Sequence, residues 1–260
     1  MAWTKTKTVV AGTIILAVIA LAVVVRWRFF PSIKDEYFKS SYQAFQKVPG
    51  NLLVVRRTHY SLPANGTSFS SSTRTPSGQF IMRQMGRNVP LERVMAMAYQ
   101  CNPSRIVLPP GKPQSNFDFL VTVPDPSQER FKAAIQKKLG YTAHWETRDT
   151  DVLLLETRMP DPPGLKVSTA GNGNVSFKNG KYEFTHMRLA SVMGFLEYAL
   201  KQPVLDRTGL TNFYDFSVKM SWHVPGGPDQ KATEKILDEL GLKLEPGNES
   251  VQMLVVEKAH

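Results

Sequence analysis

Phe117–Val121 reads FDFLV and Tyr214–Val218 reads YDFSV, and this recurring strand decides the fold because it marks an internal repeat. Within each copy aromatic residues stand two positions apart, which is the period typical of a half-buried strand. A helix is expected upstream of each copy, because Asn88–Met95 (NVPLERVM) and His186–Met193 (HMRLASVM) carry apolar residues at matching positions. Elements repeated in the same order indicate two structural units of one kind.

The repeat continues downstream of each strand. The matched segments are Phe131–Tyr141 (FKAAIQKKLGY) with Thr233–Leu242 (TEKILDELGL), then Val152–Glu156 (VLLLE) with Met253–Glu257 (MLVVE). The first pair predicts helices that end in Leu-Gly, with Gly140 and Gly241 as left-handed C-caps. The second pair predicts one short closing strand for each unit.

The order strand, helix, strand, helix, strand predicts an α+β fold in which helices pack on small mixed sheets. Two related modules are expected, at residues 51–160 and 181–260, and Lys181–Phe184 is expected to open the second. Residues 161–180 are predicted to be a linker, because the segment around them is rich in Pro and Gly.

The N-terminal region predicts a membrane segment. Residues 9–25 read VVAGTIILAVIALAVVV and carry no charge, which favours a single transmembrane signal anchor over residues 9–28, with residues 1–8 as a cytoplasmic tail. A cleaved signal peptide is the alternative interpretation. The anchor predicts contact with membrane lipid through residues 9–28, location in a bacterial inner membrane, and a periplasmic body. The full predicted fold class is therefore a transmembrane helix followed by two α+β modules.

Residues 29–50 are expected to form a juxtamembrane stalk helix that ends at Pro49-Gly50. Its aromatic residues fall near one helical face, which predicts either packing on the body or a docking surface for another membrane protein subunit. The proposed interface residues are Trp27, Phe29, Phe30, Tyr37, Phe38, Tyr42 and Phe45.

Composition excludes several classes of function. The single cysteine, Cys101, excludes a disulfide framework and a multi-cysteine metal site, and it is expected to be buried and inert. The net charge of +10 is scattered among the residues, with no aromatic-flanked basic cluster that would indicate nucleic-acid binding. Neither a metal-binding histidine spacing nor a nucleotide-binding or hydrolase motif is present, so no catalytic, metal or cofactor-binding residue is assigned.

Pro203–Phe216 reads PVLDRTGLTNFYDF. This run resembles the signature of a soil-associated bacterial family of unknown function, and Leu237–Pro246 and Val251–Lys258 extend the resemblance. Asp206 is expected to form an Asx-type turn with Gly209 in a left-handed conformation, whereas Tyr214 and Phe216 are buried and Asp215 points outward.

The repeat unit is also remotely similar to the short N-terminal domain of secretins and TonB-dependent receptors. Those small βαβ modules dock protein partners in the periplasm, so the resemblance implies a docking role.

Three functions are consistent with these observations. The leading expectation is a non-catalytic, membrane-anchored envelope protein that serves as an accessory or scaffolding subunit of a larger complex. The alternatives are a periplasmic sensor that binds a peptide or ligand at exposed sheet edges, and an envelope hydrolase with a cleft between the modules.

Overall fold

The computed structural model describes residues 35–39, 41–60, 66–74, 80–111, 115–219 and 230–259. The predicted tail and anchor, together with Trp27, Phe29 and Phe30, lie outside these ranges. The chain divides into two compact units, Met1–Pro49 and Gly50–His260.

The predicted fold class is correct for its α+β part and is corrected for its transmembrane helix. A helix that spans a membrane needs about 20 apolar residues. The longest helix among the described residues, α4 (Ser127–Leu139), has 13 residues and carries several charged side chains. Within the described ranges, no helix combines the length and the apolar character needed to cross a membrane.

The described residues of the N-terminal unit, 35–39 and 41–49, form two short helices where one stalk helix was expected. The 3₁₀ helix η1 covers Asp35–Phe38 and the α-helix α2 covers Tyr42–Gln46. Ser41, the residue before α2, has an extended backbone, so the two helices are not continuous. Its side chain forms no hydrogen bond that caps α2.

The first half of the larger unit is a four-stranded antiparallel sheet with two helices. The strands are β1 (Leu53–Arg57), β2 (Thr67–Arg74), β3 (Phe80–Val89) and β5 (Phe117–Val121), in the order β1-β5-β3-β2. The helices are α3 (Leu91–Tyr99) and α4, and a 3₁₀ turn η2 (Pro103–Arg105) follows α3.

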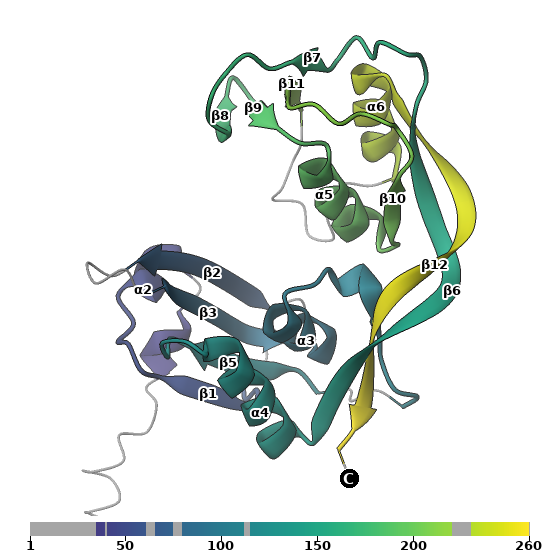
Figure 1. Ribbon diagram of the computed structural model, residues 1–260. Helices are drawn as coiled ribbons and strands as arrows, with labels where there is room; N and C mark the ends of the chain where they lie inside the picture. Colours follow the sequence, from purple (N-terminus) through teal and green to yellow (C-terminus); the bar gives the residue numbers. More distant parts are fainter. Residues whose placement is uncertain are drawn as a thin grey trace, which may run out of the picture. The chain divides into compact units, whose positions relative to one another are not determined.

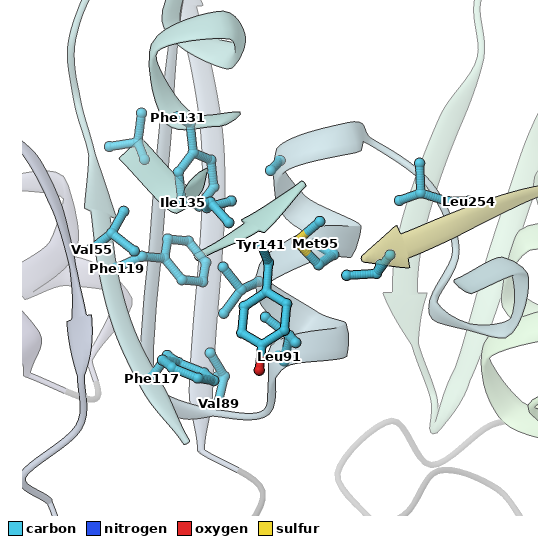
Figure 2. Packing of buried hydrophobic residues seen from close by; sticks show 14 of the residues in the cluster. Val55, Val89, Leu91, Met95, Phe117, Phe119, Phe131, Ile135, Tyr141 and Leu254 are labelled. Atoms are coloured by element: carbon cyan, nitrogen blue, oxygen red, sulfur yellow. The ribbon is translucent and has the colours of Figure 1, made fainter. Parts of the chain in front are cut away.

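The first core is the buried cluster that joins this sheet to α3 and α4. It contains Phe119 and Phe131, whose ring centroids lie 5.0 Å apart, together with Met95. Gly86 of β3 is required here, because a Cβ at this position would overlap the Phe119 ring. Figure 2 shows that Leu254 lies in the same cluster, although it is distant in sequence.

The second half repeats the arrangement. Its sheet contains β7 (Lys166–Val167), β8 (Asn174–Lys178), β9 (Lys181–Met187) and β11 (Tyr214–Val218), in the order β7-β11-β9-β8, and all pairs are antiparallel. The helices are α5 (Ala190–Leu200) and α6 (Gln230–Leu240). The second core combines apolar residues of these helices with Tyr214 and Phe216, which are buried as predicted.

A long ribbon links the two halves. Strands β6 (Tyr141–Thr157) and β12 (Leu242–Lys258) pair antiparallel over all 17 residues of each strand, from Tyr141↔Lys258 to Thr157↔Leu242 (Figure 1). Strand β10 (Val204–Asp206) adds parallel to β6, and β4 (Ile106–Val107) adds parallel to β12. This third sheet is therefore mixed, as the predicted fold class requires.

The ribbon exchanges the two predicted closing strands. Leu155, in the segment expected to close the first module, is fully buried in the second core. Leu254 and Val256, in the segment expected to close the second module, are buried in the first core. Each strand begins in one half and ends in the other. Its 17 residues span about 55 Å at 3.3 Å per residue, which is long enough to reach both cores.

The repeat persists in the backbone conformation of equivalent residues. Gly140 and Gly241 are left-handed, with φ of 73° and 77°, which confirms both predicted C-caps. Gln100 and Lys201 are the left-handed C-caps of α3 and α5. These matches support a common local plan for the two halves.

Candidate protein-interaction surface

The aspartate in the recurring strand stabilises a backbone bulge. In the first half, Asp118 is fully buried, and its carboxylate accepts hydrogen bonds from the Asn88 backbone N–H at 2.9 Å and from Arg56 Nε at 3.1 Å. Asn88 has a φ of 54° and lies where the pairing of β3 with β5 shifts register. Asp118 is therefore a structural residue, because its charge is neutralised inside the fold.

The second half uses the same device. Asp215 accepts a hydrogen bond from the His186 backbone N–H at 2.8 Å, and His186 has a φ of 53°. The Ser168 hydroxyl and then the His186 N–H hold the pKa of Asp215 below its usual value. Asp215 alternates with the buried Tyr214 and Phe216, as expected of a side chain that points outward, and its carboxylate also hydrogen-bonds to the neighbouring backbone.

Between β10 and β11 the PVLDRTGLTNFYDF run contains a turn, as expected. The Asp206 carboxylate accepts hydrogen bonds from the Thr208 backbone N–H at 2.9 Å and from its hydroxyl at 2.6 Å. Gly209 is left-handed with a φ of 71°. Arg207 forms an ion pair with Glu249 of β12 at 2.8 Å, which ties the turn to the ribbon.

A buried ion pair joins the two halves. Glu197 of α5 is 4 % exposed and accepts hydrogen bonds from Arg105 Nε at 2.9 Å and from the Val204 backbone N–H at 3.0 Å. Asn102 adds a hydrogen bond from its side-chain amide to the Gly194 carbonyl at 2.8 Å. These contacts fix the relative position of η2 and α5, and they occupy the charges that could otherwise act on a substrate.

Each described histidine has a different neighbour. The His59 ring is tilted against the Tyr60 ring, His144 lies 3.7 Å from Glu146 on the ribbon, and His186 stacks on Phe213. Over the described parts of the chain, no group of three or more His, Cys, Asp or Glu side chains is placed to hold a metal ion.

Cys101 is partly buried, and burial raises the pKa of its thiol to about 11. A thiol with so high a pKa is almost entirely protonated near neutrality, which makes it a poor nucleophile. The expectation of an inert cysteine is consistent with this environment.

The predicted interface residues fall into three groups. Trp27, Phe29 and Phe30 are outside the described residues. Phe38 and Phe45 are fully buried and Tyr37 is half-buried, whereas Tyr42 exposes 43 % of its surface. Their role as an interface stays a prediction, and buried Phe38 and Phe45 do not contribute to a solvent-facing surface.

A different apolar surface lies at the edge of the second sheet. Strand β8 is the outermost strand next to β9, and the two form a hairpin through Asn179 and Gly180. Both turn residues have positive φ, 52° and 75°, as a two-residue type I′ turn requires. The Asn-Gly pair between two alternating segments is a strong hairpin signal, and the predicted start of the second module at Lys181 divides this hairpin.

The hairpin leaves two apolar side chains in solvent. Phe177 is 63 % exposed and Val175 is 47 % exposed, and they stand opposite Tyr182 and Phe184 of β9. The Phe177 and Tyr182 rings lie 4.9 Å apart, and Phe184 stacks on Phe216 at 4.6 Å. Val175 and Phe177 therefore continue the apolar face of the second sheet beyond its core.

The turn geometry also determines which backbone groups of β8 face outward. In a two-residue hairpin the pair that flanks the turn, here Lys178↔Lys181, exchanges both hydrogen bonds, and the pattern then alternates along the strand. Ser176 and Asn174 therefore bond to β9, whereas the N–H and C=O groups of Val175 and Phe177 point away from it. We call this side of β8 the outer edge, and it offers both apolar contacts and a hydrogen-bonding ladder.

A family model described as a protein of unknown function (DUF3738) matches residues 92–259. The match agrees with the expected family of unknown function, and it does not bear on a soil origin or on secretins. Neither the curated proteins nor the solved structures contain a match to the chain.

Proposed function

The chain belongs to the DUF3738 family of proteins of unknown function, and from that starting point we propose that it is a non-catalytic binding subunit of a larger protein assembly. The outer edge of β8 carries this proposal. An exposed strand that presents apolar side chains and open backbone groups is a template for strand addition by another polypeptide.

The structure around the edge supports a scaffolding role. The Arg105–Glu197 ion pair and the ribbon connect the two halves at several points. The second sheet, which carries the outer edge, is therefore held in place relative to the first half. A pre-organised edge loses little conformational freedom on binding, which favours affinity. The predicted envelope location stays a prediction, and the binding role does not depend on it.

A peptide sensor is the second candidate function, and the same edge favours it. A sensor binds a short extended peptide by itself, whereas a scaffold binds a strand that belongs to a folded partner. Both use the outward N–H and C=O groups of Val175 and Phe177. The hydrolase alternative has no comparable support, because the ionised side chains described above are engaged in structural contacts.

The experiment compares partner capture by the full-length chain with capture by two edge variants. Val175→Pro removes one outward N–H, and Phe177→Lys removes the larger apolar contact. Proline is tolerated at edge strands, so the variant is expected to fold. Val167→Lys is the matched control, because Val167 is 61 % exposed on β7 at the opposite edge of the same sheet.

We expect a stoichiometric partner that both edge variants lose and the control retains. Hydrogen exchange on the captured complex should show new protection at the β8 amides. A partner held equally by all four proteins, with β8 amides still unprotected, would show that the outer edge is not the binding site.

A further inference from the structure

We propose that the outer edge of β8 pairs antiparallel with β8 of a second copy of this chain, about a twofold axis that passes next to Ser176. The inference rests on the proposed function, because it takes the outer edge as the docking site and names its occupant. Closed twofold pairing requires a surface that is complementary to itself, and the sequence of β8 has this property.

The register follows from the strand sequence Asn174-Val-Ser-Phe-Lys178. With Ser176 opposite Ser176 of the second copy, Val175 faces Phe177 of that copy, and Phe177 faces its Val175. These residues carry the outward backbone groups, so each Val–Phe pair exchanges two hydrogen bonds. Ser176 bonds to β9 within its own chain and therefore forms the non-hydrogen-bonded pair at the axis.

The side chains fit the same register. In an antiparallel pair, opposing residues project from the same face, so the two Val–Phe pairs form one apolar patch that joins the apolar faces of both sheets. Lys178 stands opposite Asn174 of the second copy, so the pairing brings no two lysines into direct opposition. A shift of the register by one residue would place Val175 and Phe177 against polar neighbours and lose the complementarity.

The size of the contact predicts a weak dimer. Five residues per strand bury much less than the roughly 1,200 Å² of a standard interface. We therefore expect a dissociation constant in the micromolar range or weaker, with monomer and dimer exchanging rapidly. When this chain is dilute, most of it is monomeric, and the outer edge is then available to another partner.

The first experiment is sedimentation equilibrium of the full-length protein across a wide concentration range. We expect a monomer–dimer equilibrium that Val175→Pro and Phe177→Lys each weaken at least about tenfold, which corresponds to about 1.4 kcal/mol. Val167→Lys, at the opposite edge, should leave it unchanged. A chain that stays monomeric at all concentrations, or a dimer insensitive to both edge variants, overturns the inference.

The second experiment tests the register with a single cysteine. Cα atoms of a non-hydrogen-bonded antiparallel pair lie about 4.5 Å apart, which is within the range that a disulfide bridges. In a Cys101→Ala background, Ser176→Cys should form a covalent dimer under mild oxidation, whereas Asn174→Cys should not. Equal crosslinking at both positions contradicts the proposed register.

The two proposals fail in different ways. If the wild-type chain is monomeric but its partner capture still depends on Val175 and Phe177, the second copy is wrong as the occupant and the binding function stands. If neither self-association nor capture depends on these residues, both proposals are wrong.

Discussion

Replacing Leu254 by alanine tests the strand exchange, because this residue belongs to the first core while its position in the sequence is near the end of the second half. Leu254 is fully buried. Truncation of a fully buried leucine costs about 3 kcal/mol, since the lost contacts leave a cavity. For a cooperative unit of this size, that cost lowers the melting temperature by about 6–12 °C.

The location of the destabilisation is more informative than its size. Native-state hydrogen exchange should show that Leu254→Ala lowers protection in α3 and α4 first, whereas Leu155→Ala lowers protection in α5 and α6 first. Thr147→Ala is the control, because Thr147 is an exposed residue of the same ribbon and its loss should cost less than about 0.5 kcal/mol. The reverse pattern of protection would refute the exchange.

Three further outcomes are expected. Glu197→Ala should cost about 1–3 kcal/mol, because it leaves the buried Val204 N–H and the partly exposed Arg105 without their acceptor, and Glu197→Met with Arg105→Met should recover part of the loss in urea unfolding. Asp215→Asn should remove stability above about pH 4 and progressively less as the pH falls, because the lowered pKa of Asp215 favours the folded state only while it is ionised; urea midpoints at several pH values measure this. Cys101, with its pKa raised to about 11, should react with iodoacetamide far more slowly at pH 8 in the folded chain than in urea, as followed by mass spectrometry; equal rates would contradict its burial.

Local features of the fold were predictable from the sequence. Gly140 and Gly241 each follow a Leu at the end of an amphipathic segment, and left-handed C-caps depend only on such local geometry. The buried Tyr214 and Phe216 followed from a period of two for the same reason. The hydrogen bond from the His186 N–H to Asp215 was not predicted, because His186 lies where the strand pairing shifts register and the alternation pattern does not reveal that shift.

The exchange of closing strands could not be predicted, because it depends on long-range packing. Val152–Glu156 and Met253–Glu257 have similar apolar patterns, and either segment could fill either core. The ribbon that carries them was hidden by the polar middle of β6, where Thr147 and Asp149 face Gln252 and Ser250. A pattern of hydrophobicity predicts that a residue is buried, but it does not specify which core buries it.

The candidate site was missed for a related reason. Val175 and Phe177 read as ordinary strand residues, and the Asn179-Gly180 turn was sufficient to predict their hairpin. Their exposure, however, depends on the order of strands in the sheet, which places β8 at its end. The hairpin was therefore predictable from the sequence, but the position of β8 at the edge of the sheet was not.

The ribbon also constrains how the protein is made. The first core needs Leu254 and Val256, which are synthesised long after α3 and α4. Since a chain leaves the ribosome from its N-terminus at about 5–20 residues per second, the first half must wait at least several seconds with an incomplete core. Both halves therefore reach their final packing only after β12 has been synthesised, and until then the apolar residues of the first core lack the contacts of Leu254 and Val256.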